Sequence, residues 1–211
     1  MRWIRKGPEP AELVEYKAAA SVDWKPTYAG LDKGPVRRAL IREQGYLCCY
    51  CGGPIGERLD DCHIEHFVAQ STTDETLRLE YTNMLASCQG TDGRSRVPEH
   101  CGQARGTKPV PVSPLAPDCG TFFTWGADGA VRSSTEAQKH ADAEMTIRSL
   151  SLDTRRLRAA REAAIAGALL GLDDLPSERW RAEARRYDAP GLDGRLVPFC
   201  FAIQHVLSSY A

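Results

Sequence analysis

Apolar side chains recur with a helical period over several stretches of this chain. Between Pro35 and Gly45, the residues Val36, Leu40 and Ile41 fall on one face of a helix. Proline in the first turn and glycine just past the last turn are favoured at the two ends of a helix. This stretch is therefore predicted to be an amphipathic helix.

Helical periodicity also dominates the C-terminal half of the chain. Ser133 and Glu136 fit a capping box at the start of one predicted helix. Asp153 is the expected cap of a second helix, which ends at Gly171. Outside the first stretch, the predicted helices span residues 11–20, 133–150, 153–171, 177–187 and 199–209.

A few short stretches have the composition of strands. Residues 62–67 are predicted to form a strand, and residues 121–131 a hairpin whose turn contains two glycines. The Pro-rich residues 109–117 are expected to be a linker or an extended strap. The predicted fold class is α+β.

These elements divide the chain into four regions. Residues 1–34 form an arm that is expected to bind a partner, and residues 35–108 form a cysteine-bearing module. Residues 109–132 hold the strap and the hairpin, and residues 133–211 form a helical region. A chain of 211 residues with 42% hydrophobic content can bury one full core and a small satellite module.

Charge and hydropathy narrow the function classes. The net charge of −1 is unlike that of a domain built to hold duplex nucleic acid by itself, but it leaves nuclease chemistry open. The basic run at residues 155–161 is expected to be a solvated helix face. No apolar stretch reaches the length of a membrane span, and the basic N-terminus lacks an apolar core, so we expect a cytoplasmic protein without a membrane partner.

The eight cysteines argue for a metal site, because a reducing compartment keeps thiols free. Cys48 and Cys51 have the spacing of a zinc knuckle, and Cys88 and Cys101 can supply a second pair across a long loop. His100 could replace Cys101, although thiolate is the favoured ligand. The alternative is a set of unligated buried thiols. The remaining cysteines are expected to be buried as small hydrophobes: Cys49, Cys62, Cys119 and Cys200.

A second group of polar residues lies between the two cysteine pairs. Phosphodiester hydrolysis needs a base for the attacking water and a cation for the phosphate oxygens. His66 suits the base, and Glu65 could hold Mg²⁺ or Mn²⁺. Neighbours on an ideal strand point to opposite faces, so both reach one site only if the strand ends or bulges there. His63 either supports the ion or is structural, and Asn83 is expected to orient the loop through its amide.

Taken together, Glu65, His66, Asn83 and the cysteine pairs resemble the HNH (ββα-metal) nuclease family. In that pattern the residue before the catalytic histidine is often an acidic metal ligand, which corresponds to Glu65 and His66, and a central asparagine corresponds to Asn83. The resemblance implies a zinc-stabilised ββα-metal module embedded in a mostly helical frame, with one catalytic divalent ion.

The resemblance extends to a bacterial subfamily that supplies the nuclease subunit of Septu-type anti-phage defence systems and that accompanies some retrons. This resemblance implies an ABC/SMC-like ATPase partner and a nucleic acid target, with DNA favoured over RNA. The matching stretches are residues 6–10, 43–51, 63–67, 100–102 and 143–152.

Two positions depart from the family pattern. Ala69 stands where a proline often follows the catalytic histidine. No His or Asn directly follows Cys101, so the third ligand of the catalytic ion is open between His100 and Gln103, of which His100 is the better ligand. Arg105 is expected to contact substrate phosphate, because the family has a basic residue there.

The function predicted from the sequence is hydrolysis of nucleic acid by a metal-dependent HNH endonuclease. In this hypothesis His66 activates water, Glu65 holds the ion and Asn83 orients the loop. The alternative is a zinc-knuckle adaptor that binds an ATPase or nucleic acid without cutting. A zinc enzyme of other chemistry is less favoured, because four cysteine ligands leave no open position on the metal.

Overall fold

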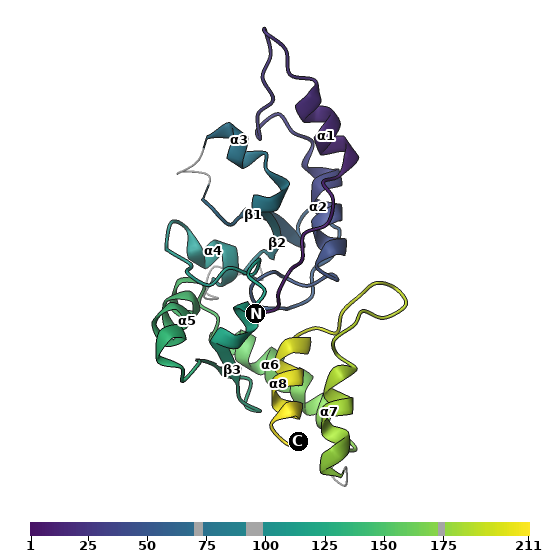
Figure 1. The fold of residues 1–211 in the computed structure, drawn as a ribbon, viewed down its shortest axis with the longest axis vertical. Coiled ribbons are helices and arrows are strands. Elements are labelled where there is room, and N and C mark those ends of the chain that lie inside the picture. The colour runs from purple at the N-terminus through teal and green to yellow at the C-terminus, as the bar shows by residue number, and fades with distance from the viewer. Residues whose placement is uncertain (70–73, 92–98, 173–175) are drawn as a thin grey trace.

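The computed structural model describes residues 1–69, 74–91, 99–172 and 176–211, and over these ranges the fold is α+β, as predicted. Two separate antiparallel sheets of two strands each lie among the helices (Figure 1). In chain order the elements are α1 (Ala11–Ala18), α2 (Lys33–Glu43), β1 (Cys62–His66), α3 (Glu75–Arg78), the 3₁₀ helix η2 (Tyr81–Asn83), β2 (Met84–Cys88), α4 (Cys101–Arg105), the 3₁₀ helix η3 (Cys119–Phe122), β3 (Phe123–Trp125), β4 (Val131–Ser133), α5 (Ala137–Ser149), α6 (Arg155–Leu169), α7 (Ser177–Arg185) and α8 (Cys200–Ser208).

The first sheet pairs β1 with β2. Its register aligns Cys62 with Cys88 at one end and His66 with Met84 at the other. β2 is a nearly continuous apolar run that was not predicted as a strand, and both α2 and α4 pack against it. The buried face of α2 is the predicted one, formed by Val36, Leu40 and Ile41.

Both ends of α2 are fixed by side chains. Asp32 is the N-cap, so the helix begins two residues earlier than predicted, and its carboxylate accepts a hydrogen bond from the N–H of Gly34. After the helix, the buried amide of Gln44 donates to the carbonyls of Leu47 and Ala86 and accepts from the N–H of Ala86. The end of α2 is therefore tied directly to the middle of β2.

The N-terminal arm packs on the chain's own core. Met1 and Ile4 are buried, and the N–H of Ile4 donates to the carbonyl of Pro114 at 2.8 Å. Lys6 forms an ion pair with Glu43 at the end of α2, with 2.7 Å between Nζ and Oε1. The Pro-rich stretch is therefore an extended strap rather than a free linker. The loop between α1 and α2 lies at the top of the molecule in the view of Figure 1.

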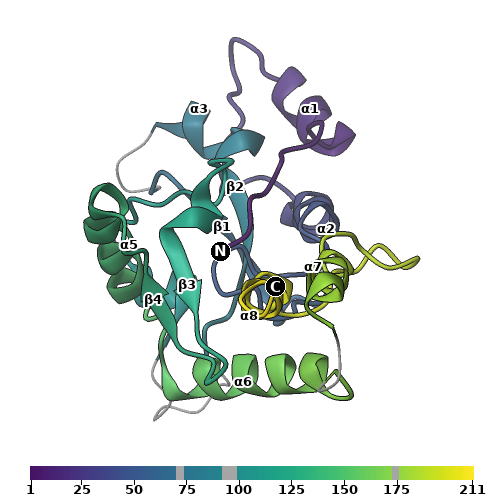
Figure 2. The same cartoon turned by 60° about the horizontal axis from the view of Figure 1, so that its bottom comes forward.

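The second sheet is the predicted hairpin of β3 and β4, and helices surround it (Figure 2). α5 packs against β4, while α8 packs against β3 and also contacts α6 and α7. Figure 2 shows α6 lying across the base of this arrangement. Among the described residues, none of the helices combines the length and the apolar character needed to cross a membrane.

Two predicted helix caps are wrong. Helix α5 begins at Ala137, with Glu136 at the N-cap and no side-chain cap, so Ser133 does not form the predicted capping box. Helix α6 is capped by Thr154 rather than by Asp153. The carboxylate of Asp153 instead accepts hydrogen bonds from a backbone N–H of β4 and from arginines of α6. In both cases the side chain that the sequence suggested as a cap forms its hydrogen bonds with other groups.

The basic run on α6 is a solvated face only in part. Arg155 and Arg156 are exposed, as expected. Arg161 is only 2% exposed, and its guanidinium donates to the carbonyls of Gly129 and Leu152. This arginine is therefore a core residue that joins α6 to the turn of the hairpin, which corrects the prediction for that position.

Candidate functional site

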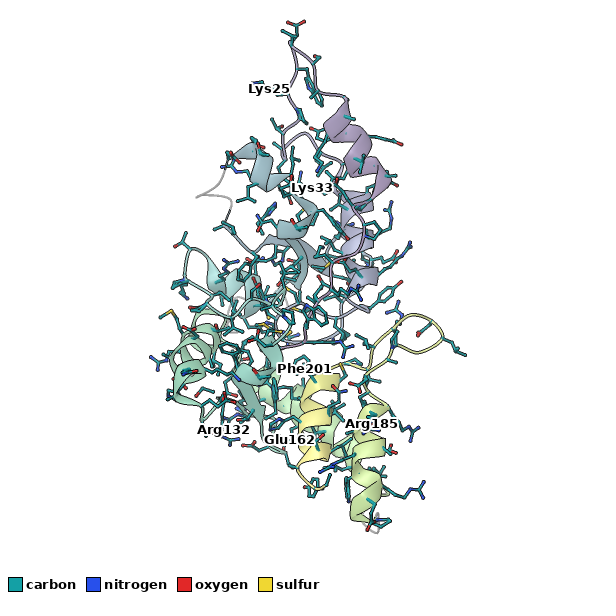
Figure 3. All side chains as sticks on the ribbon, in the orientation of Figure 1. Lys25, Lys33, Arg132, Glu162, Arg185 and Phe201 are labelled. Atoms are coloured by element: carbon teal, nitrogen blue, oxygen red, sulfur yellow. The ribbon has the colours of Figure 1, made fainter. Side chains whose placement is uncertain are left out.

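The four cysteines predicted to bind zinc lie together. Figure 3 shows several sulfur atoms near the middle of the molecule. The sulfur atoms of Cys48, Cys51, Cys88 and Cys101 all lie within 4.8 Å of one another, and those of Cys51 and Cys88 are 3.9 Å apart. Zn–S bonds of about 2.3 Å in a tetrahedron place the sulfur atoms about 3.8 Å apart. The four cysteines could therefore hold a metal such as zinc. The remaining cysteines are buried outside this cluster, as predicted: Cys49, Cys62, Cys119 and Cys200.

The backbone brings these cysteines together from three places. Cys48 and Cys51 lie on a tight turn in which the N–H of Gly52 donates to the carbonyl of Cys48 at 3.0 Å. The other two cysteines end β2 and begin α4. Cys101 has a φ of +57°, which costs a residue with a side chain about 1–3 kcal/mol. Its N–H donates to the carbonyl of Leu150 at 2.8 Å, which holds this conformation.

The electrostatics of the cluster suit a cation. Burial raises the pKa of the Cys101 thiol. Burial acts in the same direction on Cys48, but hydrogen bonds from the neighbouring thiols of Cys101, Cys49 and Cys51 bring the pKa of Cys48 well below its ordinary value. Since the thiolate rather than the thiol is the metal ligand, the cluster carries negative charge that a bound metal ion would neutralise.

His100 flanks the zinc cluster. It is buried, and its Nδ1 lies 3.7 Å from the sulfur of Cys88. Gly90, with a φ of +67°, approaches so closely that a Cβ there would lie 2.1 Å from the carbonyl oxygen of His100. No contact among the described residues joins His100 to Glu65. The prediction that His100 holds a catalytic ion therefore has no supporting contact, and the other candidate, Gln103, is exposed.

The carboxylate of Glu65 is part-buried and lies in a hydrogen-bond network. Its Oε1 accepts from Nη1 of Arg105 at 2.6 Å and from the hydroxyl of Tyr50 at 2.9 Å. Its Oε2 lies 3.5 Å from Nε2 of His63. Burial alone raises the pKa of this carboxyl, but the hydrogen bonds from His63 and Arg105 outweigh that effect and lower it. Glu65 is therefore ionised at neutral pH, with its second oxygen facing an imidazole.

Arg105 acts as a buried clamp at the end of β1. It is 7% exposed, and besides Glu65 its guanidinium donates to the carbonyls of His66 at 3.0 Å and Phe67 at 2.6 Å. A contact with substrate phosphate, as predicted from the sequence, would require Arg105 to leave this network. The described contacts give it a structural role that the sequence did not indicate.

His63 and Glu65 form a pair directly against the start of α4. A Cβ at Gly102 would lie 2.5 Å from Nε2 of His63 and 2.7 Å from Oε2 of Glu65, so glycine permits this close approach. The Nδ1 atom of His63 is buried without a hydrogen-bond partner. Adjacent ligands of an octahedral Mg²⁺ or Mn²⁺ ion, at about 2.1 Å from the metal, are about 3 Å apart. The imidazole nearest to Glu65 is thus that of His63, and the pair fits two positions around such an ion.

His66 belongs to a different set of contacts. Its Nε2 lies 2.9 Å from the carbonyl oxygen of Arg78, and the ring of Tyr28 meets it edge-on with 4.6 Å between centroids. The side chain is 4% exposed, and this burial lowers the pKa of His66, so the imidazole is neutral at pH 7. The hydrogen bonds described for the side chains of Glu65 and His66 therefore go to different groups, as is usual for neighbours on a strand.

Asn83 joins the two segments next to His66. Its Oδ1 accepts a hydrogen bond from the N–H of Val68 at 2.7 Å, and its Nδ2 donates to the carbonyls of Val68 and Leu77, both at 3.2 Å. Asn83 is 5% exposed and closes η2 immediately before β2. One amide thus ties the segment after β1 to helix α3.

We expect Asn83→Ala to lower the free energy of unfolding by about 1–3 kcal/mol, because part-buried backbone groups of Val68 and Leu77 lose their partner. Urea unfolding of the zinc-loaded protein measures the change. Asn83→Asp keeps the acceptor for Val68 but should not restore stability, because its second carboxylate oxygen would face the carbonyl oxygens of Val68 and Leu77. A stability of Asn83→Ala within about 0.5 kcal/mol of the parent, as is common for a surface substitution, would contradict this role.

Three contributors to the site were not predicted from the sequence. Tyr50 donates a hydrogen bond to Glu65 from the turn that carries Cys48 and Cys51. Its position between these cysteines was the one feature of the sequence that could have indicated this role. Tyr28 reaches His66 from the N-terminal arm. Arg78 contributes its backbone carbonyl to His66, and a carbonyl has no signature in a sequence.

The predicted residues fall into two neighbouring groups. The four cysteines form one group, with His100 beside it, while Glu65, His66 and Asn83 line the end of β1 and the segment that follows it. Tyr50 connects the groups, since it lies on the knuckle and contacts Glu65. A scan of protein-family models finds no match to this chain, and a search of curated proteins finds none either.

Proposed function

We propose that this chain is a metal-dependent endonuclease of the HNH type, which hydrolyses phosphodiester bonds of nucleic acid, with DNA favoured over RNA. One observation carries the proposal. A neutral, buried histidine is held by a backbone carbonyl at the end of the strand in which a part-buried, ionised glutamate directly precedes it. The order of β1, β2 and α4 along the chain agrees with a ββα-metal module.

The contact between His66 and Arg78 suits a general base. Because a carbonyl only accepts, Nε2 of a neutral imidazole must carry the proton that it shares with Arg78. The Nδ1 atom then carries the lone pair that can take a proton from water. The lowered pKa of His66, caused by burial, keeps this form populated at pH 7. The edge of Tyr28 restricts the ring further.

A divalent ion would be held by Glu65 through Oε2, with His63 as its nearest imidazole. Mg²⁺ or Mn²⁺ supplies positive charge for the phosphate oxygens and for the leaving alkoxide. Oε1 of Glu65 stays with Arg105 and Tyr50, so the carboxylate is oriented before an ion arrives. In this proposal Arg105 is a positioning residue.

The zinc cluster has a structural part in this proposal. Four thiolates saturate a tetrahedral Zn²⁺, so the ion holds the knuckle against β2 and α4 and takes no part in hydrolysis. The ABC/SMC-like ATPase partner, the role in anti-phage defence and the cytoplasmic location belong to the proposal through the resemblance to Septu-type nucleases. The N-terminal arm is the proposed partner-binding region.

Metal-dependent cleavage tests the proposal. The zinc-loaded protein, with and without an ATPase encoded beside it, is incubated with supercoiled plasmid, single-stranded DNA or tRNA. We expect cleavage with Mg²⁺ or Mn²⁺, its loss with EDTA, and its recovery when excess Mg²⁺ is added back. Zinc content is measured after EDTA, so that loss of the structural ion is not mistaken for loss of the catalytic one. Glu65→Gln, which keeps the shape of the side chain, should remain inactive at every metal concentration.

A non-catalytic adaptor is the second candidate function. The pairing of Glu65 with Arg105 favours it, because a carboxylate in a buried ion pair can serve structure alone. An adaptor would bind the ATPase or nucleic acid equally well with and without Mg²⁺ and would leave every substrate intact. That result, obtained with the partner present, would overturn the nuclease proposal.

A further inference from the structure

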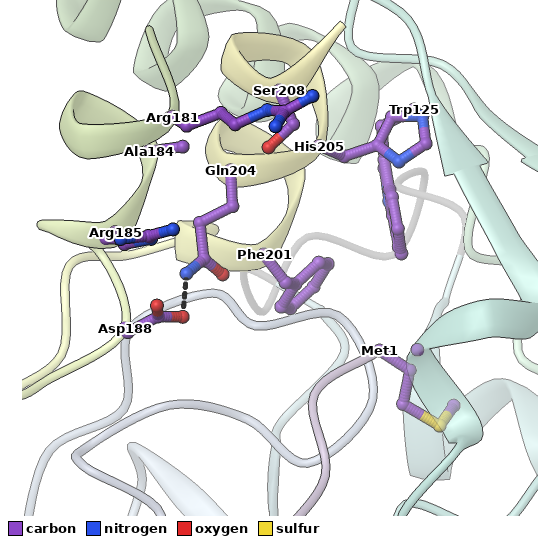
Figure 4. A pocket seen from close by; sticks show the side chains of 11 residues that line it. Met1, Trp125, Arg181, Ala184, Arg185, Asp188, Phe201, Gln204, His205 and Ser208 are labelled. Carbon is purple, nitrogen blue, oxygen red and sulfur yellow. Dashed lines mark hydrogen bonds between the residues drawn. The ribbon is translucent and has the colours of Figure 1, made fainter. Parts of the chain in front are cut away.

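A pocket of about 500 Å³ lies between α7, α8 and the end of the β3 strand, and its lining includes neither the four clustered cysteines nor Glu65 and His63. Figure 4 shows side chains from these elements around it. Its volume is within the range of pockets that take small ligands, about 300–1,000 Å³. The residues that line it and carry the argument below are Trp125, Arg181, Arg185, Phe201, Gln204 and His205.

Aromatic rings form one side of the pocket. The ring of Trp125 lies 5.1 Å from that of Phe201 and 5.4 Å from that of His205, measured between centroids. Phe201 and His205 are half-buried, and both line the pocket together with the buried Trp125. Burial lowers the pKa of His205, so this imidazole is neutral at pH 7 and offers both a donor and an acceptor. Such a surface suits a flat, partly polar group.

Two guanidinium groups line the side of the pocket formed by α7. Arg181 and Arg185 are one turn apart on α7, and both point toward α8 across the pocket in Figure 4. Neither forms an ion pair with any carboxylate among the described residues, whereas Arg186 on the same helix is paired with Glu183 at 2.8 Å. Two unpaired cations one helical turn apart are suited to a phosphate, which an arginine can bind through two parallel hydrogen bonds.

The acidic residue of the pocket is already engaged. Asp188 accepts a hydrogen bond from Nε2 of Gln204, drawn as a dashed line in Figure 4, and its backbone carbonyl accepts from Arg2. The amide oxygen of Gln204 remains as an acceptor, and Ser208 adds a hydroxyl at the rim. These groups can pair with the edge of a base. Asp188 keeps its negative charge, so the two arginines exceed the acidic charge of the pocket by one.

From this arrangement we propose that the pocket binds a nucleotide, with the base against Phe201 and His205 and the phosphate between Arg181 and Arg185. Bases stack on aromatic rings and on guanidinium planes regardless of sequence, with about 1–3 kcal/mol per stacked base. An acidic peptide would use the arginines but would gain little from the aromatic side. The nucleotide could be free or could be part of a single-stranded nucleic acid. The inference does not depend on the nuclease proposal.

Isothermal titration of the full chain tests the pocket with four probes, which are ATP, AMP, a short single-stranded oligonucleotide and an acidic peptide that contains one phenylalanine. We expect nucleotide binding that weakens at least about tenfold in Arg181→Ala and further in the Arg181→Ala, Arg185→Ala double variant. The matched control is Arg179→Ala, which removes an arginine of α7 outside the pocket and should bind like the parent. His66→Ala should also bind normally, which separates this site from the proposed nuclease centre.

Each result of the titrations either supports or overturns the nucleotide proposal. Binding of ATP or AMP that depends on the two arginines supports a free nucleotide as ligand, and binding of the oligonucleotide alone supports a nucleic acid strand. Absence of binding by all nucleotide probes at millimolar concentration overturns the proposal. Nucleotide binding that survives the double variant, or tighter binding of the peptide than of any nucleotide, overturns it as well.

Discussion

Replacing His66 with alanine is expected to reduce cleavage by about 10²–10⁴-fold, the usual contribution of a general base. The imidazole is neutral because it is buried, and its contact with Arg78 fixes which nitrogen carries the proton. Alanine removes both properties and leaves the neighbouring Glu65 in place. The measurement is the single-turnover rate of plasmid nicking at saturating Mg²⁺.

The folded state must be checked beside the rate, because His66 is buried and packs against Tyr28. Circular dichroism and zinc content should match the parent protein, and His66→Asn provides a second variant that keeps a polar side chain. The matched control is His140→Ala, since His140 is exposed and lies on α5. Cleavage by His66→Ala at the parental rate would remove His66 from the proposed mechanism.

Local patterns in the sequence were sufficient for elements whose cause is local. The apolar face of α2 was predicted from the spacing of Val36, Leu40 and Ile41, and the hairpin from the glycines of its turn. The cluster of four cysteines, which could hold a metal such as zinc, was predicted because the spacing of ligands reflects the geometry of a metal site. β2 was not predicted, because strands covered by helices such as α2 and α4 lose the alternation that identifies them.

Apart from the four cysteines, the contacts of the site that join distant parts of the chain could not be predicted. The partner of Arg105 is Glu65, 40 residues earlier, and no pattern in the sequence links the two. The sequence pointed to His100 as a metal ligand on chemical grounds alone, yet its backbone places it beside Cys88. The wrong predictions of helix caps have the same origin, because the carboxylate of Asp153 accepts hydrogen bonds from the arginines of α6 and from the β4 strand. The chemical type of each site could be predicted from its residues, whereas the hydrogen-bond partners of individual side chains could not.

Replacing Cys48 with serine is expected to abolish stoichiometric zinc binding and to leave a poorly soluble, largely unfolded protein. Structural zinc sites contribute about 10–16 kcal/mol of apparent binding energy at pH 7, whereas whole domains are stable by about 5–15 kcal/mol. If the loss of one ligand releases the ion, the protein therefore loses an amount comparable to its entire stability. The knuckle, the end of β2 and the start of α4 all meet at the cluster, so they should loosen together.

Elemental analysis of zinc per chain and thermal unfolding followed by circular dichroism measure this effect. Cys119→Ala is the matched control, because Cys119 is equally buried but lies outside the cluster. It should retain one zinc per chain and lose at most the few kcal/mol of a small core cavity. Chelation of zinc from the parent protein should reproduce the loss seen with Cys48→Ser, since both remove the same bonds between the three segments. A Cys48→Ser protein with one zinc per chain and an unchanged melting temperature would refute the structural zinc site. Another interaction would then have to hold Glu65 and His66 in place.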